Sequence, residues 1–196
     1  MNSLSTAAIY LLQTVGSLYL LVVLLRFLLQ LVRADFYNPV SQFIVRATKP
    51  LLMPLRRIIP GYGGLDFASL VLALVIQLVL MILIIVLMGY ALPNIILLVA
   101  WSAIAILALF AKIFFFALII SVILSWVAQG SYNPAVLLIN QLCEPLLAPI
   151  RKILPALGGL DLSPIAAFIA IRLFDMLVIA NLAAAAGMPR GLTLAL

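Results

Sequence analysis

Four long stretches of the chain are almost entirely apolar, and the polar residues gather between them. The stretches are Ala7–Val32, Phe67–Tyr90, Ile95–Ala128 and Leu162–Ala186. A helix needs about 20 mainly apolar residues to cross a bilayer, so each stretch is long enough to span it. The third is longer than one upright helix requires, and we expect it to tilt, to begin in the interface or to break into two. The pattern predicts an all-α integral membrane protein with four transmembrane helices.

The polar segments 33–66 and 129–161 are copies of one motif. The 30 positions from Tyr37 to Asp66 recur 95 residues later, and 15 of them are identical. Four prolines and a glycine pair stay in register, which chance similarity would not produce. Each copy lies between two spans, so the chain divides into repeat 1 (residues 1–95) and repeat 2 (residues 96–196). Two spans per repeat make the repeats parallel, whereas inverted repeats are commoner in alternating-access transporters.

Each motif begins with a helix-start signal. Asn38 can cap a helix whose first residue is Pro39. Apolar residues then recur at helical spacing with polar residues between them, which predicts a short amphipathic helix. Because an interior proline costs about 3 kcal/mol, we expect Pro50 and Pro54 to break this helix. A further turn should follow and end at Pro60.

The motif has a structural and a functional interpretation. Structurally, it lies on the inner membrane face and returns the chain to the bilayer, with Asp66 and Asp161 capping the next spans. Functionally, two copies side by side would form a platform for lipid and for a partner. This platform would carry four basic residues, Arg56, Arg57, Arg151 and Lys152. Each basic residue near an anionic leaflet contributes about 1 kcal/mol. No aromatic residues interleave with these cations, so we expect no direct nucleic-acid partner.

The basic residues also predict the topology. They concentrate in segments 33–66 and 129–161, and the positive-inside rule therefore places both motifs in the cytoplasm. Both termini then lie outside, in the periplasm of a bacterium. The N-terminus lacks a basic region and a small-residue cleavage site, so we expect its first span to be retained.

Composition excludes several kinds of chemistry. The chain of 196 residues is 68% apolar and 8% charged, whereas soluble domains are about 45–50% apolar and about 25% charged. It has no histidine, one cysteine (Cys143) and five acidic residues. These counts exclude a Ser-His-Asp triad, His/Cys zinc sites, His-ligated haem and a disulfide within the chain. We therefore expect neither an enzyme nor a bound metal or cofactor.

Four charged residues fall inside the predicted spans. Arg26 is about 10 Å along a helix from Arg33 and can snorkel toward the cytoplasmic head groups. Lys112 lies near the middle of the third span. Arg172 and Asp175 lie three residues apart near the middle of the fourth span, on one helical face. The positions in repeat 1 that match these last three are Ser17, Gln77 and Leu80, so the cluster belongs to repeat 2 alone.

The charges make insertion of the fourth span into the bilayer energetically marginal. Arg172 and Asp175 together cost about 5–7 kcal/mol near the bilayer centre, while the apolar residues of Leu162–Ala186 return about 5 kcal/mol. The fourth span should therefore need a partner, and Asp175 between Arg172 and Lys112 would tie it to the third span. The alternative is an ion path, since ionisable residues inside a membrane often mark one.

Several motifs together carry a family resemblance. They are Arg26 to Gln30 at the end of span one, the following Asp35-Phe36-Tyr37-Asn38-Pro39, the two P-L-L-x-P blocks that end in G-G-L-D, and Ser125-Trp126-Val127. Across nearly the whole chain the sequence resembles the YggT family (YlmG/YggT-like) of small bacterial inner-membrane proteins, in its two-repeat form. The resemblance implies no catalytic residues. It implies links to osmotic-stress tolerance and ion homeostasis in bacteria, and to nucleoid distribution and cytochrome maturation in plastids.

Two functions remain open from the sequence. The first is an inner-membrane scaffold or assembly factor that engages anionic lipid and a membrane or cell-division partner through Arg56, Arg57, Arg151 and Lys152. The second is an ion-homeostasis protein that uses Lys112, Arg172 and Asp175. A homo-oligomer is left open, because four spans make a thin bundle.

Overall fold

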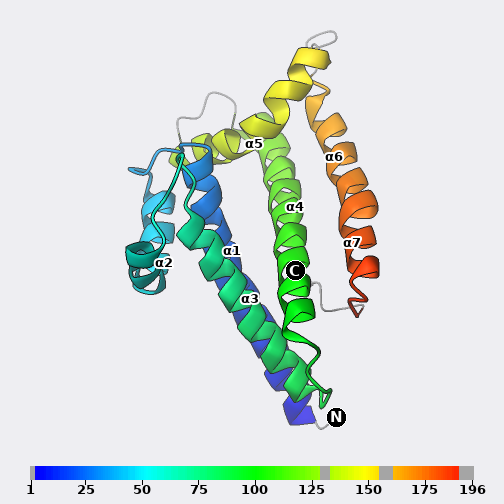
Figure 1. Ribbon diagram of the computed structural model, residues 1–196. Helices are drawn as coiled ribbons and strands as arrows, with labels where there is room; N and C mark the ends of the chain where they lie inside the picture. Colours follow the sequence, from blue (N-terminus) through cyan, green and yellow to red (C-terminus); the bar gives the residue numbers. More distant parts are fainter. Residues whose placement is uncertain (1–2, 129–132, 155–160, 190–196) are drawn as a thin grey trace.

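The computed structural model describes residues 3–128, 133–154 and 161–189, which are helical apart from short connections (Figure 1). Four helical segments are long and apolar enough to cross a membrane. They are α1 (Ser3–Leu31), α3 (Phe67–Leu87), α4 (Ile95–Val127) and a fourth span composed of α6 (Ser163–Phe174), the π-helix η1 (Asp175–Ile179) and α7 (Ala180–Ala185). The prediction of an all-α, multi-pass fold is confirmed.

The third span does not break. Helix α4 runs without interruption for 33 residues, which at 1.5 Å per residue is about 50 Å. This exceeds the hydrocarbon core of a bilayer, about 30 Å thick. Helix α4 must therefore tilt or extend beyond the hydrocarbon, as its length indicated.

The spans form an open, layered bundle. Helices α1 and α3 lie side by side along most of their length, α4 packs on α3, and the fourth span packs on α4 (Figure 1). Leu24, Leu72 and Leu118 belong to one buried cluster that joins α1, α3 and α4. A Cβ added at Gly16 would lie 2.5 Å from the methyl groups of Leu80. Glycine at this position therefore allows α1 and α3 to approach each other closely.

Each motif contains one amphipathic helix with the predicted cap. Helix α2 (Pro39–Ile58) follows Asn38, whose side chain accepts a hydrogen bond from the Val40 amide at 2.9 Å. Helix α5 (Pro134–Ile153) follows Asn133, whose side chain accepts from the Ala135 amide at 2.9 Å. The Asn-Pro start signal is confirmed in both copies.

The expectation that Pro50 and Pro54 break the motif helix is wrong. Helix α2 continues through both prolines and ends at Ile58, just before Pro60. Ile44 and Leu52 of α2 are buried in clusters that include α1 residues. Burying one such side chain contributes about 1.5–3 kcal/mol, which is comparable to the cost of a proline. Tertiary packing thus keeps the helix intact.

The two motif helices meet only where they begin. The Asn38 side-chain amide donates to the Pro134 carbonyl at 2.6 Å. From this point α2 folds back along α1 and α3, whereas α5 crosses over α4 toward α6 (Figure 1). The basic C-terminal ends of α2 and α5 therefore lie far apart. Arg56, Arg57, Arg151 and Lys152 do not form one platform.

Candidate functional site

The motif helix holds the Arg26 side chain. This side chain is 7% exposed, and its Nη1 donates to the Val45 carbonyl at 2.9 Å and to the Thr48 hydroxyl at 2.7 Å. The reason is the path of α2, which folds back along α1 and places its own oxygen atoms beside the guanidinium. Arg26 therefore ties the first span to the motif helix.

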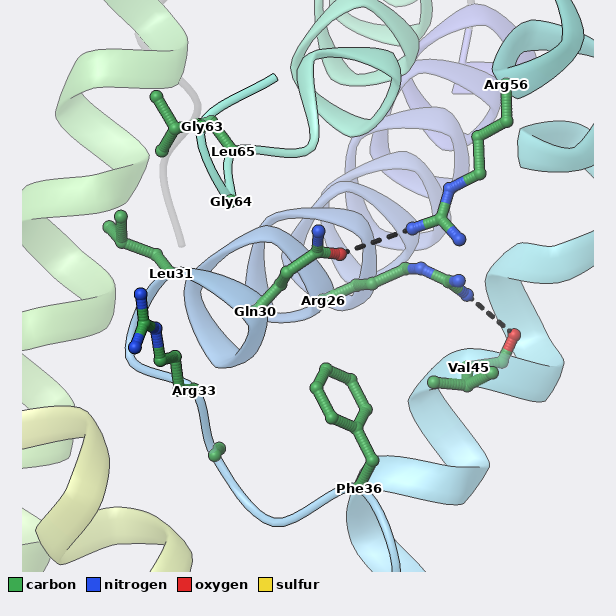
Figure 2. Close-up of a pocket in the computed structure, with 11 residues that line it drawn as sticks. Arg26, Gln30, Leu31, Arg33, Phe36, Val45, Arg56, Gly63, Gly64 and Leu65 are labelled. Carbon is green, nitrogen blue, oxygen red and sulfur yellow. Dashed lines mark hydrogen bonds between the residues drawn. The ribbon is translucent and has the colours of Figure 1, made fainter. Parts of the chain in front are cut away.

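A cavity of about 620 Å³ lies beside Arg26, at the end of α1 (Figure 2). Arg26 reaches it from α1, Arg56 from α2, and Arg33 from the turn that follows α1. The Arg56 guanidinium also donates to the Gln30 side-chain oxygen at 3.3 Å. We call this space the arginine cavity. It brings Arg56 of α2 together with two cations from the end of α1 and the turn that follows it.

Asp66 holds Arg56 at the edge of this cavity. The Asp66 carboxylate is 3% exposed, forms an ion pair with Arg56 and accepts a hydrogen bond from the Ser69 hydroxyl at 2.6 Å. Burial alone would raise the pKa of Asp66, but the bonds from Arg56 and Ser69 outweigh burial and hold that pKa below its ordinary value. Asp66 occupies the N-cap position of α3, yet its side chain forms no cap hydrogen bond. It pairs with Arg56 instead.

The turn that presents Arg33 has an unusual backbone. Arg33 has φ of +52°, in the left-handed region that favours glycine. Its amide donates to Gln30 and the Ala34 amide donates to Leu29, which closes the C-terminus of α1. An arginine in this conformation costs about 1–2 kcal/mol relative to an unstrained residue. The turn thus holds a cation where glycine would fit more easily.

In the part of repeat 2 that the structure describes, neutral residues stand at positions that match the arginine cavity. The positions that match Arg26 and Thr48 are Ser121 and Cys143. Ser121 donates to Asn140 at 3.1 Å, and burial raises the pKa of the Cys143 thiol to about 11. The joint between span and motif helix is therefore neutral in repeat 2.

Arg151, the match of Arg56, is balanced by two carboxylates. It contacts Glu144 at 2.9 Å and Asp161 at 3.1 Å, and all three side chains are about half exposed. Asp161 also accepts from the Ser163 amide at 2.9 Å, although it precedes the N-cap residue Leu162 by one position. Its role at the start of α6 is thus close to the predicted cap.

Arg57 and Lys152 are the freely accessible members of the predicted basic set. Both are exposed, and neither forms an ion pair with any residue that the structure describes. Arg56 and Arg151, in contrast, are engaged by carboxylates within their own repeats. The four basic residues therefore fall into two classes that the sequence did not distinguish.

The remaining predicted charges do come together. Lys112, Arg172 and Asp175 line a cavity of about 180 Å³ between α4 and the fourth span. The Arg172 guanidinium lies 5.4 Å from the centroid of the Phe115 ring. Asp175 is the first residue of η1, and π-helical turns occur often at functional sites. We call this group the buried-span charge cluster. That Asp175 pairs with both cations stays a prediction.

Repeat 1 fills the matching positions with neutral residues. Ser17 and Gln77, which match Lys112 and Arg172, are almost completely buried between α1 and α3. No group of three His, Cys, Asp or Glu in the described parts of the chain could hold a metal ion. Among the described residues, the arginine cavity of repeat 1 and the buried-span charge cluster of repeat 2 are the two sites where several charged side chains line one cavity.

Comparison with known proteins identifies relatives along the whole chain. The chain is 73% identical over 195 residues to an uncharacterized protein of Pseudomonas aeruginosa, covering 99% of both chains. It is 39% identical over 178 residues to the uncharacterized protein YggT of Escherichia coli K12, covering 90% of this chain and 89% of that protein.

The family assignment rests on both repeats. No solved structure matches the chain. Residues 5–87 and 100–182 each match the family described as CCB3/YggT. Each matched segment contains two spans and the motif between them. The chain therefore belongs to the CCB3/YggT family, and it is a multi-pass membrane protein that contains two copies of the family's unit.

Proposed function

We propose that this protein is a scaffold or assembly factor of the bacterial inner membrane, with both motifs in the cytoplasm and both termini in the periplasm. It engages anionic lipid and a membrane-protein partner, such as a component of the division machinery. The observation that carries this proposal is the exposure of Arg57 and Lys152 at the ends of α2 and α5. These two cations are available to a ligand outside the chain.

The surface of α2 suits such a partner. Phe43 and Met53 are large apolar residues of α2 that remain exposed, at 65% and 48%. Exposed apolar side chains beside exposed cations favour the interface of an anionic membrane or of a protein embedded in it. The motif therefore offers two kinds of contact within one helix.

Photo-crosslinking in living cells tests the scaffold function. A photoreactive amino acid at position 57 or 152 should give a discrete adduct with another membrane protein, because both positions face outward. A probe at Val79, which is exposed on α3, should contact lipid and serves as the control. An identical adduct pattern from all three positions would contradict the scaffold.

A second candidate function is ion homeostasis, as in an osmotic-stress response. It is favoured by the buried-span charge cluster, because Lys112, Arg172 and Asp175 line one cavity beside a π-helical turn. Ionisable residues within a span are costly, and they are found most often along ion or proton paths. This function would depend on the cluster and not on the motif cations.

Potassium flux through purified protein in proteoliposomes tests this candidate. Wild-type protein should raise the flux above that of empty liposomes, and Lys112→Leu should abolish it because the substitution removes a cavity charge. Ile120→Leu, on an exposed face of the same helix, should leave the flux unchanged. Wild-type flux equal to that of empty liposomes would exclude potassium conduction and favour the scaffold.

A further inference from the structure

The arginine cavity has an excess of positive charge. Arg26, Arg33 and Arg56 all line it, and of the acidic residues that the structure describes only Asp66 pairs with one of them. Three cations and one carboxylate leave a net charge of about two. Like charges that face one cavity repel each other, and an anion between them removes that repulsion.

One arginine that lines the cavity has a donor without an acceptor. The Nε atom of Arg26 is buried and has no hydrogen-bond partner among the described residues, although Nη1 of the same side chain has two. A buried charged donor without an acceptor is costly, and native structures rarely leave one unpaired. An acceptor group from a bound ligand would satisfy it.

The geometry points to a phosphate group as this ligand, and we propose that the arginine cavity binds the phosphate of an anionic phospholipid headgroup. Guanidinium groups match phosphate because their planar N–H groups donate in pairs. Gln30 accepts from Arg56 through its side-chain oxygen, which leaves its amide nitrogen as a further donor (Figure 2).

The turn at Gly63 and Gly64 leaves room for a headgroup. Both glycines line the cavity with φ of +63° and +85°, and a Cβ at either would meet nothing within 4 Å. Only glycine adopts two such angles in succession at low cost. At these two positions the cavity wall is thus formed by backbone without side chains.

The position of the cavity favours a lipid over a soluble anion. It lies where α1 ends and α3 is about to begin, which is the boundary of two spans. Leu31 and Phe36 line it and are also exposed, at 47% and 42%. A cationic interior with an apolar rim fits an amphiphile whose phosphate enters while its acyl chains stay in the membrane.

The site should occur once per chain. Ser121 and Ala128 stand where repeat 1 has Arg26 and Arg33, and Arg151 is already neutralised by Glu144 and Asp161. This single site deepens the proposed lipid engagement and rests on it. It differs from a general attraction of Arg57 and Lys152 to the anionic leaflet.

Binding of phosphatidylglycerol to the purified, detergent-solubilised protein tests the site. Wild-type protein should retain one tightly bound phosphatidylglycerol by native mass spectrometry. Arg33→Gln should weaken its binding about tenfold or more, since it removes a charged donor. Arg33 is exposed and makes no ion pair within the described residues, so its loss should leave the fold intact. Arg46→Gln makes the same charge change at an exposed position outside the cavity and should bind like wild type.

The possible outcomes test the site and distinguish a lipid phosphate from a soluble one. Equal retention of phosphatidylglycerol by wild type and Arg33→Gln, or retention of phosphatidylcholine as strong as that of phosphatidylglycerol, would overturn the site. Displacement of the lipid by millimolar inorganic phosphate would show that the cavity binds soluble phosphate, and it would overturn the proposal that the ligand is a phospholipid. The Arg33→Gln and Arg57→Gln proteins also separate the two proposals. Loss of binding in Arg57→Gln alone supports general leaflet attraction and rejects the cavity, while normal crosslinking at position 57 in Arg33→Gln leaves the scaffold standing.

Discussion

Replacing Asp66 with asparagine should lower the free energy of unfolding by about 2 kcal/mol, the typical contribution of a hydrogen bond to a charged group. The Asp66 carboxylate is buried and accepts from both Arg56 and Ser69, so the amide would leave a cation without its counter-ion. Unfolding of the purified protein in detergent, followed by circular dichroism over a denaturant series, measures the change.

The second repeat supplies the matched control for Asp66. Asp161 also pairs with an arginine, but both side chains are about 43% exposed, and exposed pairs contribute about 0–1 kcal/mol. Asp161→Asn should therefore destabilise the protein by less than about 1 kcal/mol. Equal losses in the two variants would show that burial of Asp66 does not strengthen its pair.

The effect of Asp66 should also depend on pH in a defined direction. Because its pKa is lowered in the folded state, the stabilisation is complete above the unfolded pKa of about 4 and declines only as pH falls through the folded pKa. The unfolding curves of wild type and Asp66→Asn should differ fully at pH 7 and converge in acid. A difference that grows in acid would contradict the assigned ion pair.

Asp175→Leu should reduce the amount of protein in the membrane, and by more than replacing all three charges of the cluster. Insertion energies alone predict the opposite, since removing a central aspartate saves about 3 kcal/mol. Within the shared cavity, however, the single substitution leaves Lys112 and Arg172 facing each other without their carboxylate. Loss of the partner of a buried charge costs about 3–5 kcal/mol.

Quantitative immunoblotting of isolated membranes measures this effect. The triple substitution Lys112→Leu, Arg172→Leu and Asp175→Leu removes every charge of the cluster and should restore accumulation to near the wild-type amount. Met176→Leu, one residue further along η1, controls for disturbance of the π-helical turn. Equal accumulation of the single and triple variants would end the pairing hypothesis.

The fold was predictable where the signal is local. Runs of apolar residues mark the four spans, and Asn38 and Asn133 mark the starts of α2 and α5. The predicted break at Pro50 was wrong because local helix propensity carries no information about the buried contacts that hold α2 together. The partners of Arg26 could not be predicted for a similar reason, since they depend on α2 folding back along α1.

The arginine cavity was harder to predict because its residues lie in three separate segments. Arg26, Arg33 and Arg56 meet only after two helices and a turn have packed. One signal was nevertheless present in the sequence. Comparing the repeats shows Ser121 and Ala128 at the positions of Arg26 and Arg33, so these two cations are not required by the shared fold. Residues in which two copies of one motif differ are good candidates for function.

The burial of Cys143 has a practical consequence for studying this protein. The thiol is fully enclosed, and its pKa of about 11 keeps it protonated and unreactive at neutral pH. The native chain therefore behaves toward maleimide reagents as a cysteine-free background. A cysteine introduced at an exposed position, such as Tyr90 between the second and third spans, becomes the reactive thiol, and an impermeant label then reports which side of the membrane it faces.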